Sequence, residues 1–226
     1  MPDAANHFAQ LLGLDPSDLG SLLDRARRRR FDAGEVVCHA GDPADTMHVV
    51  RSGHFAVRIT TEFGATATIN IVGPGDAFGE LALLTPGEPR SATVAALEGG
   101  ETLSVHELDF GRLRAERPET DAVLTRLLAA RVRGLSEQLV EALYLPVDTR
   151  VRRRLLGAVA VYGAVEPGAT LPLTQEELAS LAGTSRATVN RVLREEQEHG
   201  AVELTRGRTT LVDPEALARR ARGFGG

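Results

Sequence analysis

The spacing of hydrophobic residues changes along the chain, and each change marks a different kind of element. Between residues 31 and 105, apolar and polar residues alternate in short runs, and glycines such as Gly34, Gly41 and Gly53 separate the runs. Alternation bounded by turn residues is typical of short antiparallel strands. The pattern therefore predicts a small β-barrel or jelly roll, with strands over 35–37, 47–50, 55–60 and 66–72.

On both sides of this region, apolar residues recur at the spacing of an α-helix. Residues 1–30 are predicted to form short helices, and the arginines at 27–30 are interpreted as a solvated helix end. A longer helix is predicted over 121–145. Its apolar residues follow the spacing of a two-stranded coiled coil, which predicts a parallel homodimer, and the alternative is a helix packed on its own β-domain. These residues are Leu128, Val132, Leu135, Leu139 and Ala142.

A second helical region follows Pro146, which interrupts the long helix and is predicted to act as a hinge. Thr174 begins a capping box, the helix it opens ends at a glycine, and Ser185 caps the next helix. Two helices joined by a tight glycine turn are typical of a helix-turn-helix. A predicted hairpin over 201–212 would form the wing that often accompanies it.

Arginine side chains distinguish this helix pair from an antiparallel pair inside some other domain. Arg186 and Arg191 lie on the face of the second helix opposite its packing residues. Arginine donating to guanine is the commonest specific contact in the major groove, so DNA binding is the favoured interpretation. Ser185 and Thr188 are expected to contact phosphate, and the hairpin arginines either contact phosphate as well or belong to a solvated turn. The predicted DNA-binding residues are Thr174, Ser185, Arg186, Ala187, Thr188, Arg191, Arg206 and Arg208.

One loop-rich stretch combines the groups that a phosphate and a ribose require. Gly79 and the residues after it present backbone N–H groups at a helix start without side-chain bulk. Arg90 adds a planar fork of donors, while Ser91 and Ala92 add a hydroxyl and a further N–H group. Glu80 would repel a phosphate, so a ribose hydroxyl is its expected partner. The alternative is an ordinary turn with Arg90 as a solvated charge.

Composition narrows the classes of protein to which the chain can belong. Its 226 residues suit two domains, and its net charge of −5 is unevenly distributed. Residues 1–145 carry 14 arginines against 21 acidic residues, whereas residues 146–226 carry 12 against 10, which permits DNA binding by the C-terminal part. The single cysteine, Cys38, excludes a disulfide framework and a four-cysteine iron–sulfur cluster. We recognise no secretory signal or membrane-spanning run, so a cytoplasmic protein is expected.

Motifs of enzymes and metal sites are missing from the sequence. We find no Gly-rich Walker loop, zinc-protease pair or nucleophile elbow, so no enzymatic activity is expected. His39, His48 and His54 form no His-x-His pair of the kind that metal-dependent jelly rolls use. Each is interpreted as a surface or strand-end histidine. No metal is predicted, and the scattered histidines leave a haem-sensing variant open.

The sequence GELALL, followed by Arg90-Ser91-Ala92, resembles the phosphate-binding cassette of the cyclic-AMP receptor protein/fumarate–nitrate regulator (CRP/FNR) family of bacterial transcription regulators. The string FDAGEVVCHAGDPADTMHVVRSGHFAVR further resembles the start of that family's sensory β-roll. The resemblance implies an α+β chain that binds a two-fold-related operator in double-stranded DNA as a homodimer, with RNA polymerase as a partner. Its implied parts are a cyclic-nucleotide-binding jelly roll over 1–117, a dimerisation helix over 118–145 and a winged helix-turn-helix over 146–226.

The resemblance also implies roles for individual residues. Arg90 would bind the cyclic phosphate and Glu80 the ribose 2′-hydroxyl of a cyclic nucleotide, with cAMP favoured. In the cyclic-AMP receptor an adjacent threonine and serine contact adenine, where this chain has Leu135 and Ser136. That receptor also reads cytosine with a glutamate where this chain has Ala187, which predicts a different half-site. The predicted ligand-binding residues are Gly79, Glu80, Leu81, Arg90, Ser91, Ala92, Arg131, Leu135 and Ser136, with Arg131 paired to Glu80.

The chain is therefore predicted to be a dimeric, cytoplasmic transcription regulator that a cyclic nucleotide controls allosterically. Two alternatives stay open. Leu135 would fill the base site in a regulator of the same fold that is constitutive or answers another ligand. Alternatively, the chain is a nucleotide-binding interaction module whose C-terminal domain docks a protein.

Overall fold

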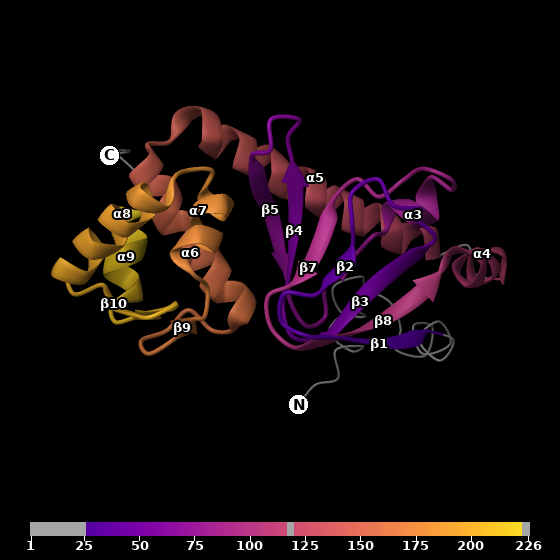
Figure 1. Ribbon diagram of the computed structural model, residues 1–226, viewed down its shortest axis with the longest axis horizontal. Helices are drawn as coiled ribbons and strands as arrows, with labels where there is room; N and C mark the ends of the chain where they lie inside the picture. Colours follow the sequence, from indigo (N-terminus) through magenta and orange to yellow (C-terminus); the bar gives the residue numbers. More distant parts are fainter. Residues whose placement is uncertain (1–25, 117–119, 223–226) are drawn as a thin grey trace. The chain divides into compact units, whose positions relative to one another are not determined.

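The computed structural model describes residues 26–116 and 120–222 (Figure 1). Within the described part, one compact unit takes in residues 26–61 and 70–134, and a second takes in 62–69 and 135–222. The helices predicted over residues 1–25, the start of the predicted dimerisation helix at Pro118 and the C-terminal tail from 223 lie outside the described residues.

Two antiparallel sheets build the first unit, apart from residues 66–69 of one edge strand, as the alternating pattern predicts. One has the strand order β1-β8-β3-β6 and the other has the order β2-β7-β4-β5. Strands distant in the sequence are thereby neighbours, since β1 pairs with β8 and β2 pairs with β7. The strands are β1 Arg27–Phe31, β2 Val36–Cys38, β3 Thr46–Ser52, β4 Phe55–Thr60, β5 Thr66–Val72, β6 Ala77–Phe78, β7 Thr93–Ala96 and β8 Gly100–His106.

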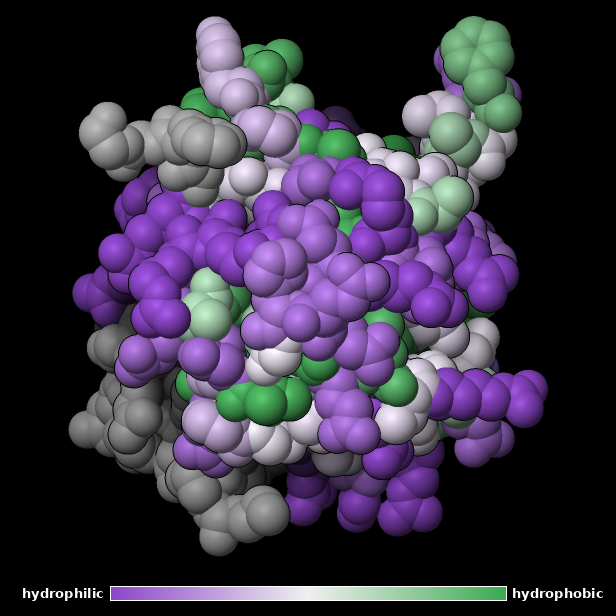
Figure 2. Space-filling model, turned by 90° about the vertical axis from the view of Figure 1, so that its left-hand side faces the viewer, coloured by the Kyte–Doolittle hydropathy of each residue, from purple (hydrophilic) through white to green (hydrophobic). Residues whose placement is uncertain are grey.

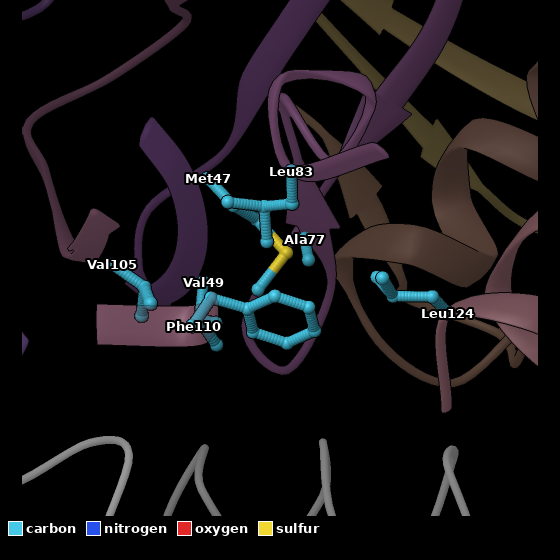
Figure 3. Close-up of a cluster of buried hydrophobic side chains, with 7 residues drawn as sticks. All are labelled: Met47, Val49, Ala77, Leu83, Val105, Phe110 and Leu124. Carbon is cyan, nitrogen blue, oxygen red and sulfur yellow. The ribbon is translucent and has the colours of Figure 1, made fainter. Parts of the chain in front are cut away.

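A cluster of buried hydrophobic side chains packs the first sheet against the helices that follow it. The helices are α3 (Leu81–Leu84), α4 (Glu107–Glu116) and α5 (Thr120–Tyr144). Figure 3 shows Met47 and Val49 of β3 beside the ring of Phe110 from α4. The cluster also includes Leu124 of α5. Burying such side chains stabilises the fold by roughly 1.5–3 kcal/mol each. The members are Met47, Val49, Ala77, Leu83, Val105, Phe110 and Leu124.

The long helix predicted over 121–145 is confirmed as α5, and its C-terminal half carries a run of exposed apolar side chains. Four of the five residues of the predicted coiled-coil seam are exposed, and the fifth, Leu128, is half-buried. An exposed apolar helix face of this kind is typical of an interaction surface. The exposed large apolar residues of α5 are Val132, Leu135, Leu139, Val140, Leu143 and Tyr144.

The second unit is a group of helices with a small sheet of order β10-β11-β9. Pro146 caps the first helix of this unit at its N-terminus, which agrees with the predicted break after α5. Leu155, Val189 and Leu211 are fully buried and join the helices to the sheet. The elements are α6 Val147–Tyr162, β9 Thr170–Leu171, α7 Gln175–Ala182, α8 Arg186–Glu198, β10 Val202–Thr205, β11 Arg208–Leu211 and α9 Pro214–Arg220.

Three interpretations of the sequence are wrong in the first unit. The arginines at 27–30 are not a helix end but form edge strand β1, where Arg28 and Arg30 pair with Glu101 of β8. The pattern also missed α4, whose apolar periodicity is weak. His48 is neither a surface nor a strand-end histidine, because it is buried inside β3 and stacks on Phe78.

Acid is expected to destabilise the first unit through His48. Burial is the main cause that lowers the pKa of His48 to about 3, and the charges of Arg90 and Arg29 lower it further. The unfolded chain, with a histidine pKa near 6.5, takes up this proton before the folded chain does. This contribution to stability is therefore complete above about pH 6.5 and is lost as the pH falls towards 3.

The variant His48→Leu should flatten this pH dependence, because leucine fills a similar volume without a titratable group. The measurement is the urea midpoint of unfolding between about pH 6 and pH 4, followed by circular dichroism. An equally steep loss of stability in the variant would show that another group is responsible.

Candidate functional site

The predicted phosphate site forms around a close contact between Gly79 and Arg90. Arg90 is only 9% exposed, and its Nη1 donates to the carbonyl oxygen of Thr46 at 2.6 Å while Nη2 donates to the Thr46 hydroxyl at 2.8 Å. A Cβ atom on Gly79 would lie 2.6 Å from Arg90 Nη1, and Gly79 has a φ of +78°. The position therefore requires glycine twice, for its backbone conformation and for the space that the guanidinium occupies. Arg90 is not the solvated surface charge of the alternative interpretation.

The backbone holds Arg90 in place from the other side. Its N–H group donates to the carbonyl of Asp42 at 2.8 Å, and its own carbonyl accepts from Gly41 N–H at 2.8 Å. The Nε atom of the buried guanidinium has no hydrogen-bond partner among the described residues. A buried donor without an acceptor costs about 1–3 kcal/mol, so this atom is suited to an anionic ligand that supplies one.

Glu80 lies beside this arginine in sequence but faces a different partner. The Glu80 carboxylate is 4% exposed, and its Oε1 lies 3.3 Å from Nε of Arg131 on α5. Arg131 Nη2 also donates to the carbonyl of Ala77 at 2.5 Å. The structure thus brings Glu80 and Arg131 together as the sequence predicted, and two arginines meet the loop from different elements.

The other predicted ligand-binding residues take varied positions. Leu81, the first residue of α3, is partly exposed, Ser91 is exposed and Ala92 is half-buried in the loop before β7. Leu135 and Ser136 are exposed on the part of α5 that is assigned to the second unit. Sequence reasoning missed Thr46, which holds Arg90 from 44 residues away. No local signal marks such a residue, because its role depends on the pairing of distant strands.

The helix-turn-helix has the local geometry that its sequence predicts. The Thr174 side chain accepts from Glu177 N–H while the Glu177 carboxylate accepts from Thr174 N–H, which completes the capping box. Gly183 ends α7 in the left-handed conformation with φ +61°. Ser185 then caps α8 by accepting from Thr188 N–H at 3.2 Å. Both hydroxyls therefore stabilise the helix starts.

A groove brings together four of the predicted DNA-binding residues. It lies between the start of α7, one face of α8 and the β10–β11 turn, and it has a volume of about 570 Å³. Three arginines line it, so an anion is the kind of partner it suits. Much of the surface on the side of α8 and α9 is hydrophilic (Figure 2). The predicted residues that line the groove are Thr174, Arg186, Arg206 and Arg208.

The remaining predicted DNA-binding residues do not line this groove. Ser185 and Ala187 are exposed and Thr188 is half-buried on the first turn of α8. Arg191 is 55% exposed and pairs with Asp148 of α6 rather than pointing freely outward. This acidic partner holds Arg191 in place, and the pair in turn keeps the pKa of Asp148 below its usual range, mainly through the hydrogen bond from Arg191.

Sequence reasoning also missed Asn190, which lines the groove one turn after Arg186. Its side-chain amide donates to Gln175 Oε1 at 3.0 Å and accepts from Arg194 Nε at 3.0 Å, so its orientation is fixed. Asparagine is the residue type that pairs with adenine through two hydrogen bonds. Asn190 is four residues after Arg186, so the two side chains lie on the same face of the helix, and this spacing is the signal in the sequence that indicates Asn190.

Two further properties concern the described part of the chain. No cluster of at least three histidine, cysteine or carboxylate side chains there is arranged to hold a metal ion. No helix among the described residues is long and apolar enough to cross a membrane.

Comparisons with known proteins match both units. Residues 28–117 match the model of the cyclic nucleotide-binding domain, and residues 149–220 match the Crp-like helix-turn-helix domain. A CRP-like cAMP-activated global transcriptional regulator from Mycobacterium tuberculosis is 33% identical over 213 residues, which cover 93% of this chain and 95% of that protein. The cyclic AMP receptor protein of Thermus thermophilus is 33% identical over 212 residues, covering 94% and 96%.

Solved structures of similar proteins are regulators of the same kind. The crystal structure of the Thermus thermophilus catabolite activator protein is 32% identical, with a TM-score of 0.54, and the match covers 95% of this chain and 100% of that chain. A CRP/FNR-family regulator from the same organism is 26% identical with a TM-score of 0.70, covering 88% and 100%. With its β-roll, long helix and winged helix-turn-helix, the chain belongs to the CRP/FNR family of DNA-binding transcription regulators, and it is not an enzyme.

Proposed function

We propose that this regulator binds DNA as a homodimer under the control of a cyclic nucleotide, with cAMP as the effector. The observation that carries the proposal is the buried guanidinium of Arg90, whose Nε lacks an acceptor among the described residues, beside a glycine whose missing side chain leaves the guanidinium room. A cyclic phosphate is an anion of a size that this loop can hold with one arginine and backbone N–H groups.

Polar groups around this loop support a nucleotide rather than inorganic phosphate. Glu80 is a buried acceptor suited to a ribose hydroxyl, although it is paired with Arg131 here. The relatives from Mycobacterium tuberculosis and Thermus thermophilus are described as cAMP-activated and as a cyclic AMP receptor. We extend that effector to this chain, and we assign the phosphate to Arg90, Ser91 and Ala92, the ribose to Gly79, Glu80 and Leu81, and the base to Leu135 and Ser136.

Exposed apolar side chains on α5 support the homodimer. A second copy of the same helix would cover Val132, Leu135 and Leu139, which follow coiled-coil spacing. A two-fold dimer presents two copies of α8 to two half-sites about 34 Å apart on the duplex. We therefore assign the sensory domain to residues 1–117, the dimerisation helix to 118–145 and the DNA-binding domain to 146–226.

Family membership supports the remaining partners. A Crp-like helix-turn-helix favours DNA over a protein as the partner of the second unit. RNA polymerase is the expected partner of the DNA-bound dimer, and we place the regulator in the cytoplasm, where its operator and the polymerase meet.

One observation favours a second candidate function, in which no cyclic nucleotide is needed. Both terminal nitrogens of Arg90 already donate to Thr46, and Glu80 is already paired with Arg131. These contacts stabilise the pocket without a ligand, so a constitutive regulator of the same fold is the alternative.

Calorimetric titration of cAMP and of cGMP into the full-length protein distinguishes the two functions. Binding of cAMP with a dissociation constant of about 1 μM to 100 μM, and weaker binding of cGMP, would support the proposal. The absence of heat with either nucleotide, from a protein that still binds DNA, would leave the constitutive regulator.

Replacing Arg186 by alanine is expected to weaken specific DNA binding by about tenfold to a hundredfold, because a bidentate contact to guanine contributes roughly 1–3 kcal/mol of discrimination. The measurement is fluorescence anisotropy with a duplex that the wild-type protein selects from a random pool. Arg219→Ala, which removes an exposed arginine of α9 outside the groove, is the matched control. Equal losses in both variants would show that Arg186 acts only through its charge.

A further inference from the structure

The side chain of Arg191 projects from α8 but is held by a residue of a different helix. Its Nη1 lies 3.1 Å from Oδ2 of Asp148, and its Nη2 contacts Oδ1 of the same carboxylate. Asp148 belongs to the first turn of α6, so 43 residues separate the partners in sequence. Both residues belong to the second unit.

The geometry of this pair determines what the arginine can still bind. Asp148 takes both terminal nitrogens, which form the edge of the guanidinium that is farthest from the helix. A guanine presents two acceptors, N7 and O6, that arginine reads with two parallel N–H donors. A base reached from α8 at full side-chain extension would need the terminal edge that Asp148 already occupies.

The surroundings of Arg191 favour release of the pair on DNA. The Arg191 side chain is 55% exposed and the Asp148 side chain 30% exposed, so water reaches both groups. Glu195, one turn later on α8, lies 3.8 Å from Arg191 Nη1, and Arg152 also acts on Asp148 through its charge. An exposed ion pair of this kind is weak, and a bidentate contact to guanine outweighs it.

We propose that Asp148 is an intramolecular competitor that occupies Arg191 in the free protein and must release it when α8 reads DNA. The proposal rests on the DNA-binding function assigned to α8. Asp148 is thus a positioning residue that sets the affinity of the regulator through Arg191. Its carboxylate weakens every binding mode that uses the terminal edge of this arginine.

The test compares Asp148→Asn with wild type, using the full-length protein and a duplex selected by the wild-type protein from a random pool. Asparagine keeps the shape of the side chain but removes the charge that holds the guanidinium. The dissociation constant of Asp148→Asn is expected to fall about threefold to fivefold, the equivalent of the strongest exposed ion pairs. Thermal unfolding checks the fold, and Asp148→Ser provides a second variant without the carboxylate.

Two controls separate release of Arg191 from a general loss of negative charge. Glu176→Gln measures how much the loss of one negative charge alone changes the affinity for DNA. In the Arg191→Ala background, Asp148→Asn should change that affinity by no more than this amount, because Arg191 is no longer there to be released. Glu176 is a suitable comparison, since it is an exposed carboxylate that lines the DNA-facing groove.

The opposite outcome has a clear physical meaning. If Asp148→Asn weakens binding, Asp148 supports Arg191 in its base-reading orientation and the proposal is overturned. The proposal is equally overturned if Asp148→Asn leaves the affinity for DNA unchanged. It is also overturned if Asp148→Asn strengthens DNA binding in the Arg191→Ala background by more than Glu176→Gln does. Every dissociation constant for DNA is measured both with and without cAMP. If cAMP is not the effector, the ratio of the variant's constant to that of wild type still tests the role of Asp148.

Discussion

Arg90→Ala is expected to weaken cAMP binding by about a hundredfold or more, which would bring it below detection by calorimetry. Hydrogen bonds to charged groups contribute roughly 1.5–3 kcal/mol each, and a guanidinium offers at least two to a phosphate. The variant removes the buried Nε donor that has no partner among the described residues. It also removes the positive charge that would balance the phosphate inside the loop.

Two further variants show whether this loss reflects ligand chemistry. Arg90→Lys keeps the charge but not the planar fork, so it should retain weaker binding, by about tenfold relative to wild type. Arg112→Ala removes an exposed arginine of α4 and should bind cAMP normally. Since Arg90 also holds Thr46, circular dichroism must show that each variant is folded. Unchanged cAMP affinity in folded Arg90→Ala would show that this loop is not the phosphate site.

Glu196→Ala is expected to destabilise the second unit by about 3–5 kcal/mol, because it removes the buried carboxylate to which Nε of the buried Arg152 donates. Glu196 is 0% exposed, and its Oε1 accepts from Arg152 Nε at 2.6 Å and from Arg220 Nε at 3.0 Å. The same arginines donate to Glu195, so α6, α8 and α9 share one network of charges. Urea unfolding followed by circular dichroism measures the loss.

A double variant tests the cause of this instability. If the unpaired charge of Arg152 is responsible, Arg152→Met combined with Glu196→Leu should recover most of the lost stability, because apolar residues of similar volume replace a buried ion pair at little cost. Arg220 is partly exposed, so water and Glu195 can still solvate it. A double variant as unstable as Glu196→Ala would indicate lost packing instead.

Local rules explain why the helix-turn-helix was predictable. A capping box, a glycine in the left-handed conformation and a second capping serine each act over three or four residues, and all three are present. Strand β1 has no such local signal. Its arginines form a strand only because β8, more than 70 residues later, supplies the pairing and the Glu101 carboxylate. Tertiary pairing overrides the local preference there.

In the candidate sites, too, residues grouped by local sequence were predictable and residues brought in from distant elements were not. Gly79, Glu80 and Arg90 fall within one short stretch, so their grouping was visible in the sequence. Their neighbours Thr46 and Arg131 come from distant elements, and Arg131 was found only through its helix and the family resemblance. Asp148 was not found at all, because a lone aspartate at a helix start has an ordinary role there.

We propose that a nucleotide bound at Arg90 controls DNA binding at α8. The most direct measurement is the dissociation constant of the full-length protein for its selected duplex, by fluorescence anisotropy with and without saturating cAMP, at one fixed salt concentration. We expect cAMP to tighten DNA binding by the wild-type protein by about fivefold to 150-fold and to leave DNA binding by Arg90→Ala unchanged. Equal affinity of the wild-type protein with and without cAMP would contradict this proposal.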